Sequence, residues 1–100
     1  RVAVAGLFSI VRNVSVPYGF QIEDYPNLST TRWRVVADQK SLVYYYESTL
    51  TPNTFWLDLK KIDFSEKGSV RKLDLSDNKT YAGETSNDFK ASQPFQFLGL

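Results

Sequence analysis

The amino-acid sequence predicts an α+β fold, with one N-terminal helix followed by an antiparallel sheet of about four strands. Apolar residues recur at helical spacing before residue 15, and they alternate with polar residues at strand spacing after residue 31. Aromatic residues make up 15% of the 100 residues, a content typical of a packed domain rather than a disordered segment. A chain of this length is too short for two domains.

The residue types that are missing exclude much of enzyme chemistry. The chain contains no cysteine and no histidine, so a thiolate nucleophile, a Ser-His-Asp triad, a Cys- or His-based zinc site and a disulfide are excluded within it. Its 12 basic and 11 acidic residues give a net charge of +1, without the basic excess of nucleic-acid-binding proteins. The longest apolar stretch is too short to span a bilayer. We therefore expect no metal, cofactor, nucleic acid or membrane partner.

The first predicted element is a helix over residues 2–14. Its apolar residues follow the i, i+3, i+4, i+7 spacing of one helix face: Val4, Leu7, Phe8 and Val11. No residue that caps a helix precedes Val2, so we expect the helix to begin inside a longer chain. Gly6 is unfavourable within a helix, which indicates a close approach to another element.

Residues 17–30 are predicted to form a loop, because Pro17, Gly19 and Pro26 interrupt any regular period. Loops of this length in a compact domain are more often functional, as a lid or a pocket rim, than idle. Glu23 and Asp24 offer two carboxylates for acid–base chemistry. This is the weaker interpretation, because neighbouring loop residues rarely occupy environments that separate their pKa values.

Four strands are predicted, over residues 32–38, 42–48, 55–60 and 70–75. The first two form an antiparallel hairpin. In the first, the alternation predicts a buried face made of Trp33, Val35 and Ala37. The second carries three consecutive tyrosines, Tyr44 to Tyr46, which indicates that the strand is covered on both faces.

The rest of the chain is mostly polar. From residue 76 to residue 94 we expect only Tyr81 and Phe89 to contact the core, and the last apolar residues, Phe95, Phe97 and Leu98, to tie the end of the chain onto it. The lysines and arginines between residues 60 and 72 are interleaved with acidic residues, which favours a solvated sheet edge over a phosphate site.

Several segments together resemble the C-terminal part of choloylglycine hydrolases, and within that family the penicillin V acylases of Gram-negative bacteria. They include Val-Ser-Val-Pro-Tyr-Gly at residues 14–19, Thr-Thr-Arg-Trp-Arg-Val-Val-Ala-Asp at residues 30–38 and Val-Tyr-Tyr-Tyr-Glu-Ser at residues 43–48. Residues 55–59 and 81–84 fit the same pattern. The resemblance therefore covers most of the chain.

The resemblance implies an N-terminal-nucleophile hydrolase, an αββα sandwich of two antiparallel sheets between helical layers. Residues 1–100 are then the C-terminal fragment of one larger domain. Enzymes of this family cleave linear amide C–N bonds other than peptides, and the substrates implied here are penicillin V, acyl-homoserine lactones and conjugated bile acids. The family's nucleophile is an N-terminal cysteine, which lies outside this chain, so we expect no catalytic residue here and no activity from these residues alone.

The same resemblance gives expectations for substrate contacts and partners. Tyr18, Phe20 and Tyr25 in the loop are predicted to contact the acyl group of an amide substrate. The implied partners are that substrate, the remainder of the hydrolase chain and further copies of it, since the family forms tetramers, and the implied location is the periplasm. The alternative is a self-standing β-rich module that binds a protein or a glycan.

Overall fold

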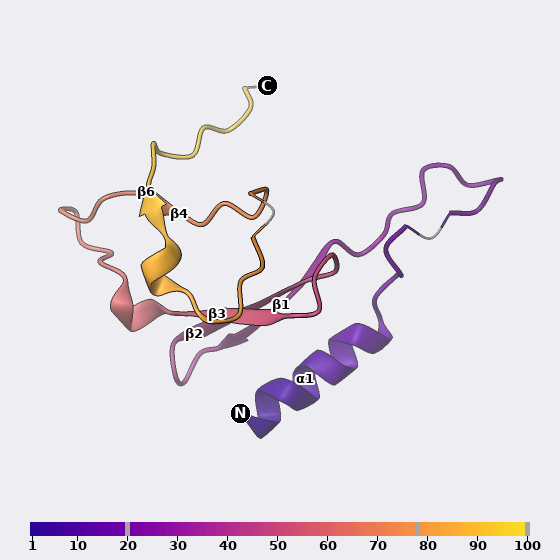
Figure 1. The fold of residues 1–100 in the computed structure, drawn as a ribbon, viewed down its shortest axis with the longest axis horizontal. Coiled ribbons are helices and arrows are strands. Elements are labelled where there is room, and N and C mark those ends of the chain that lie inside the picture. The colour runs from indigo at the N-terminus through magenta and orange to yellow at the C-terminus, as the bar shows by residue number, and fades with distance from the viewer. Residues whose placement is uncertain (20, 78, 100) are drawn as a thin grey trace.

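The computed structural model describes residues 1–19, 21–77 and 79–99, and it confirms the α+β class (Figure 1). One helix precedes a set of strands and two short 3₁₀ helices. In chain order the elements are α1 (Val2–Asn13), β1 (Trp33–Asp38), β2 (Val43–Ser48), β3 (Thr54–Asp58), η1 (Leu59–Lys61), β4 (Arg71–Lys72), β5 (Gly83–Glu84), η2 (Ser86–Asp88) and β6 (Lys90–Ala91). The predicted helix and the first three strands are thus present.

The main sheet has the order β1-β2-β3-β5. β1 pairs antiparallel with β2, and β2 with β3, as the predicted hairpin requires. The connection between β1 and β2 is closed by the Asp38 carboxylate, which accepts hydrogen bonds from the backbone amides of Lys40 (3.1 Å) and Ser41 (3.0 Å). This register places Arg34 opposite Glu47 and Val36 opposite Tyr45.

The fourth strand of the main sheet is not where the sequence predicts it. β4 keeps only two residues of the predicted strand, and it pairs with β6 in a separate two-stranded sheet. The position beside β3 is taken by β5, which runs parallel to it, and the Thr85 amide donates a hydrogen bond to the Trp56 carbonyl (2.9 Å). The Asp74 carboxylate ends the predicted strand, because it accepts from the Ser76 amide (2.9 Å) and turns the chain there.

Helix α1 lies on one face of the main sheet, and the chain after β3 lies on the other (Figure 1). Phe8 of the helix is 4% exposed and Val36 of β1 is 6% exposed. Within this chain the face of β1 that α1 covers is the Val36 face, whereas Trp33 is 57% exposed, so these residues alone do not bury the predicted Trp33 face. The alternation alone could not choose between the faces, because apolar Val35 and Val36 stand side by side and only the docking of α1 decides which is buried.

The opposite face of the sheet is covered in part by the C-terminal third of the chain. Phe55 lies between the rings of Tyr46 (centroids 5.0 Å apart) and Tyr81 (5.8 Å), and Phe89 lies over the same face. β2, predicted to be covered on both faces, is contacted on both faces but only partly covered, because Tyr44 is 42% exposed. The predicted core contacts of Tyr81 and Phe89 are confirmed.

Two smaller predictions find no contact among the described residues. The final apolar residues do not tie the chain onto its core, because Phe95, Phe97 and Leu98 are 79%, 87% and 97% exposed. A Cβ atom added to Gly6 would meet no described atom within 4 Å, so none of residues 1–19, 21–77 and 79–99 approaches that glycine closely. Among the described residues, no helix has both the length and the apolar character needed to cross a membrane.

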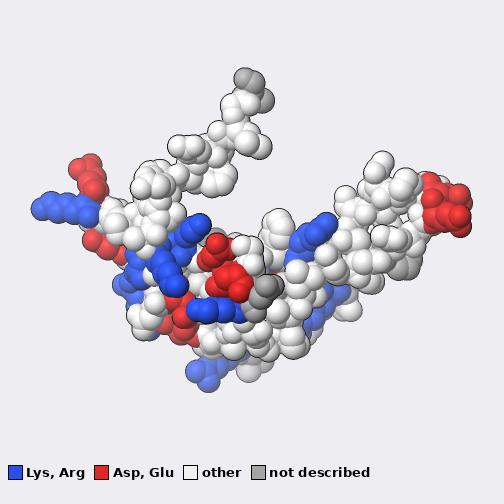
Figure 2. All heavy atoms as spheres, turned by 45° about the horizontal axis from the view of Figure 1, so that its top comes forward, with Lys and Arg blue, Asp and Glu red and all other residues white. Residues whose placement is uncertain are grey.

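The mixed charges of the sheet edge are paired, as the solvated-edge interpretation predicts. The amino groups of Lys60, Lys61 and Lys72 lie 3.9, 3.0 and 3.8 Å from the carboxylates of Asp58, Glu84 and Asp74. Figure 2 shows the two signs of charge intermixed on this part of the surface. Such exposed pairs add little stability.

We expect the Glu84 carboxylate to contribute to acid sensitivity, because it accepts hydrogen bonds from Ser86 in addition to its ion pair with Lys61. Burial opposes its ionisation, but the Lys61 ammonium and the hydroxyl and amide of Ser86 outweigh it and lower the pKa of Glu84 from 4.5 to about 2. Because the folded pKa is below the unfolded one, Glu84 stabilises the fold above pH 4.5, and this contribution is lost as the pH falls toward 2.

We expect a Glu84→Gln substitution in the full-length protein to flatten the fall in unfolding midpoint across this pH window. Urea unfolding at several pH values measures the slope. Glu66→Gln, which changes an exposed glutamate, is the matched control and should leave the slope unchanged. Identical slopes for the two variants would show that Glu84 carries no such linkage.

Candidate functional site

The loop of residues 17–30 is the part of the chain predicted to contact substrate, and it projects away from the sheet (Figure 1). Tyr18 and Tyr25 are 47% and 65% exposed, whereas the third predicted residue, Phe20, lies outside the described residues. An isolated β-bridge joins Ile22 and Tyr25, and the Tyr25 amide donates to the Ile22 carbonyl (2.9 Å). The loop therefore folds back on itself and presents its tyrosines to solvent.

The two ends of the loop are held together at its root. The Val16 amide donates to the Thr31 hydroxyl (2.9 Å), and the Thr31 amide donates to the Val16 carbonyl (3.1 Å). This pair closes the segment in the manner of an Ω-loop, whose ends lie close together. The direction in which the tyrosines project is therefore set at Val16 and Thr31.

The loop encloses a shallow hollow of about 270 Å³. Tyr18 and Tyr25 both line it, so the structure brings together the two predicted substrate contacts that it describes. Its remaining walls are Gly19, Gln21, Pro26, Leu28, Thr30 and Arg32. The guanidinium carbon of Arg32 lies 5.2 Å from the centre of the Tyr18 ring, a cation–π contact that joins the loop to the start of β1.

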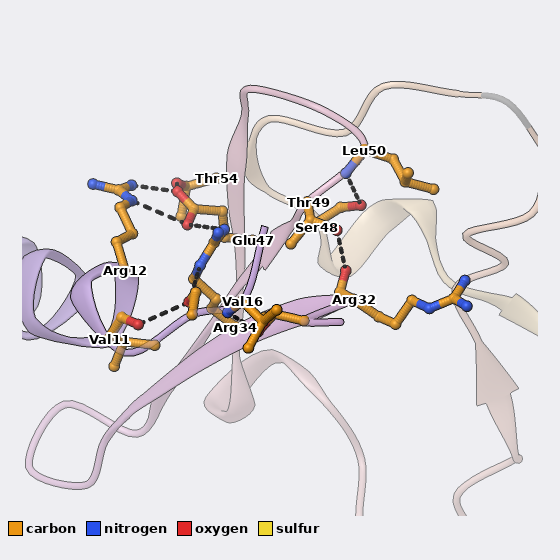
Figure 3. A network of polar contacts seen from close by, with 12 residues as sticks. Val11, Arg12, Val16, Arg32, Arg34, Glu47, Ser48, Thr49, Leu50 and Thr54 are labelled. Atoms are coloured by element: carbon orange, nitrogen blue, oxygen red, sulfur yellow. Dashed lines mark hydrogen bonds and ion pairs between the residues drawn. The ribbon is translucent and has the colours of Figure 1, made fainter. Parts of the chain in front are cut away.

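A second cluster of polar residues lies next to the root of the loop and is centred on Glu47 (Figure 3). The Glu47 side chain is 7% exposed, and it forms ion pairs with Arg34 (3.1 Å) and with Arg12. The Thr54 hydroxyl also donates to this carboxylate (3.4 Å). The cluster thus joins α1, β1, β2 and β3 through one carboxylate.

This charge cluster is connected to the loop by Ser15. The Ser15 hydroxyl accepts a hydrogen bond from Nε of Arg34 (2.8 Å) and donates one to the Val11 carbonyl (2.8 Å). Because Ser15 immediately precedes Val16, the root of the loop is fixed both to the last turn of α1 and to β1. Arg34 therefore orients the loop through a hydrogen bond while it neutralises Glu47.

The arginines also fix the charge state of Glu47. Hydrogen bonding to Arg12 lowers the pKa of the Glu47 carboxyl, burial works in the opposite direction, and the charge of Arg34 adds to the lowering. A carboxylate held ionised and fully engaged in this way accepts hydrogen bonds but has no proton to transfer. The Glu47 oxygens are occupied by Arg12, Arg34 and Thr54, so the contacts of the cluster indicate a positioning role.

Sequence reasoning did not identify this cluster, although two signals for it were present. Arg34 and Glu47 are paired across the predicted hairpin, where opposite charges stabilise each other. Arg12 follows Phe8 by four residues, which places it on the sheet-facing side of the helix. The alternation of β1 hides both signals, because a buried Trp33 face places Arg34 on the solvent side of the strand.

The remaining candidates gain no support. Glu23 and Asp24 are both exposed in the loop, so the structure does not place them in the separate environments that an acid–base pair needs. Across residues 1–19, 21–77 and 79–99, no group of three or more acidic side chains is arranged to hold a metal ion.

An apolar cavity of about 470 Å³ between α1 and the sheet is lined by Phe8, Tyr45 and Trp56 among others.

Comparisons with known proteins match the sequence and the fold. Residues 1–81 match the family described as linear amide C-N hydrolases, choloylglycine hydrolase family. The chain is 54% identical over 100 residues to a penicillin V acylase of Pectobacterium atrosepticum, an alignment that covers 97% of this chain and 27% of that protein. The chain therefore spans about a quarter of the length of this relative.

A solved structure agrees with the sequence comparisons. The penicillin V acylase from Agrobacterium tumefaciens superimposes with a TM-score of 0.87 at 50% identity, over 98% of this chain and 32% of that one. Its fold is the N-terminal-nucleophile hydrolase fold predicted from the sequence, and the present helix and sheet correspond to a C-terminal portion of it. The predicted fold class is confirmed.

Proposed function

Because the chain belongs to the choloylglycine hydrolase family of linear amide C–N hydrolases, we propose that it forms the C-terminal part of an enzyme that hydrolyses penicillin V. The observation that carries this proposal is the superposition of 98% of the chain on a penicillin V acylase with a TM-score of 0.87. Acyl-homoserine lactones and conjugated bile acids are the other amides of the proposed substrate range.

The nucleophile of the proposed reaction is an N-terminal cysteine supplied by the rest of the enzyme. Its thiol attacks the amide carbonyl, forms a thioester and releases the amine, and water then hydrolyses the thioester. The 100 residues contain no cysteine, so we propose that they have no activity alone and act as a structural and substrate-binding part. A self-standing binding module is less well supported, since both relatives carry this fold within a longer chain.

We propose that the loop of residues 17–30 forms part of the substrate mouth, with Tyr18, Phe20 and Tyr25 contacting the acyl group. The exposure of Tyr18 and Tyr25 around one hollow supports this role, because exposed aromatic rings in a concavity bind apolar groups. The cluster around Glu47 holds the loop in place.

A kinetic assay of the full-length protein tests both parts of the proposal. The wild-type protein should release phenoxyacetate from penicillin V. Tyr25→Ala should raise KM for penicillin V about tenfold with kcat within twofold, because the lost contact is made equally in the ground and transition states. Tyr44→Ala changes an exposed tyrosine of the sheet outside this hollow and is the matched control.

Three outcomes would contradict parts of these proposals. Absence of hydrolysis by the wild-type protein contradicts the proposed substrate. Hydrolysis with an unchanged KM for Tyr25→Ala contradicts the proposed mouth while leaving the reaction in place. If Tyr25→Ala lowers the unfolding midpoint along with the activity, the residue has a structural role.

The proposed oligomeric state and cellular location rest on the family resemblance alone. We propose that the full-length enzyme assembles as a homo-oligomer, with four copies as in the family, and resides in the periplasm. The native mass of the purified protein, compared with its denatured mass, gives the number of copies. Osmotic-shock fractionation of cells that express it gives the compartment.

A further inference from the structure

Arg32 differs from Arg12, Arg34 and Arg71 because its guanidinium donates no hydrogen bond to any described residue. Arg12 and Arg34 donate to Glu47, and Arg71 donates to the carbonyls of Ser86 and Phe89. Among the residues that the structure describes, no ion pair or side-chain hydrogen bond is formed by Arg32. Figure 3 shows its side chain extending away from the Glu47 cluster.

The guanidinium is nevertheless held in a defined position. The Arg32 carbonyl accepts hydrogen bonds from the amide (3.1 Å) and the hydroxyl (2.9 Å) of Thr49, which fixes the base of the side chain. At the other end, the contact with the Tyr18 ring holds the charged group at the wall of the hollow. This contact is made to the ring and not to a hydrogen-bond acceptor atom, so the N–H donors of Arg32 have no oxygen partner among the described residues and are available to a ligand.

The hollow matches a small anionic group attached to an apolar body. Arg32 supplies the charge, Gln21 and Thr30 supply further polar atoms, and Tyr18 and Tyr25 supply ring surface. A guanidinium with free N–H donors binds a carboxylate through two parallel hydrogen bonds. At about 270 Å³ the hollow accommodates part of an amide substrate.

We infer that Arg32 is a specificity-determining residue that binds the carboxylate of an anionic amide substrate at the loop hollow. The inference rests on the proposed function and narrows its substrate range. Penicillin V carries a carboxylate, and conjugated bile acids carry a carboxylate or a sulfonate, whereas acyl-homoserine lactones are neutral. Arg32 therefore favours the anionic members of the range.

Kinetics with a charged substrate and its neutral ester test the inference. With the full-length protein, Arg32→Gln should raise KM for penicillin V roughly tenfold with kcat within twofold, the loss of a partly exposed charge-assisted hydrogen bond. KM for penicillin V methyl ester should stay within twofold. Arg32→Lys should fall between wild type and Arg32→Gln, because it keeps the charge and loses the paired donors. Lys40→Gln removes the same charge from the exposed β1–β2 turn and should change neither KM.

A titration without turnover separates this inference from the proposed reaction. 6-Aminopenicillanate, the amine product, should bind the wild-type protein about ten times more tightly than it binds Arg32→Gln, while its methyl ester should bind both equally. Should the wild-type protein hydrolyse neither amide, the proposed function fails, and the titration still decides the role of Arg32. No binding of 6-aminopenicillanate, or equal binding to the two proteins, would overturn it.

Discussion

Replacing Glu47 with alanine is expected to lower the free energy of unfolding of the full-length protein by about 3 kcal/mol, because removing one partner of a buried ion pair leaves the other charge uncompensated. The Arg34 side chain is 18% exposed and cannot turn fully into water. Arg12 is 49% exposed and can turn into water. We therefore expect the loss of stability to lie near the lower end of the range for buried ion pairs. Unfolding of the wild-type protein and of Glu47→Ala in guanidinium chloride measures the difference in free energy of unfolding.

Two further variants separate the charge of Glu47 from its packing. Glu47→Gln keeps the shape and an acceptor oxygen but loses the charge, so its loss of stability should be smaller than that of Glu47→Ala. Glu66→Ala removes an exposed glutamate and should leave the free energy of unfolding within about 0.5 kcal/mol of wild type. A Glu47→Ala loss no larger than that of Glu66→Ala would show that the cluster does not stabilise the fold.

The Glu47 cluster also explains why an exposed loop can have a defined direction. Arg34 reaches Glu47 and Ser15 at once, so the same side chain belongs to the interior of the sheet and to the root of the loop. The hydrogen bond between Val16 and Thr31 then fixes where the segment that bears Tyr18 leaves the sheet. Loops that bind ligands are commonly positioned in this way by a rigid scaffold.

The elements that the sequence could predict are those whose signal is local. The spacing of Val4 and Phe8 determines the sheet-facing side of α1 without reference to anything else in the chain. The hairpin is equally local, since Asp38 closes its connection within three residues. Tyr81 and Phe89 could be identified because they are the isolated aromatic residues of a polar stretch, and burial of a large ring stabilises the contact it makes.

The features that could not be predicted depend on contacts between distant parts of the chain. β5 has two residues and gains its place from pairing with Phe55 and Trp56, which no propensity indicates. The choice between the Trp33 and Val36 faces of β1 depends on where α1 docks. In the candidate site, Tyr18 and Tyr25 were identified from their loop, but Arg32 was not, because its role depends on how the loop folds back toward β1.

A second large effect is expected at Phe55, whose replacement by alanine should destabilise the full-length protein by about 3–5 kcal/mol. Phe55 is 9% exposed on a central strand, and its ring contacts the rings of Tyr46 and Tyr81. The substitution therefore removes buried area and leaves a cavity between the sheet and the segment that covers it. Unfolding in urea, followed by tryptophan fluorescence, measures the loss.

The matched control for this substitution is Phe64→Ala, since Phe64 is 74% exposed and should lose less than about 1 kcal/mol. Combining Phe55→Ala with Tyr81→Ala tests whether the covering segment acts through this contact. Because the two rings touch, the double variant should lose about 0.5–1.5 kcal/mol less than the sum of the single losses. Additive losses would mean that Tyr81 is not held by Phe55, and the C-terminal third of the chain would then need another attachment to the sheet.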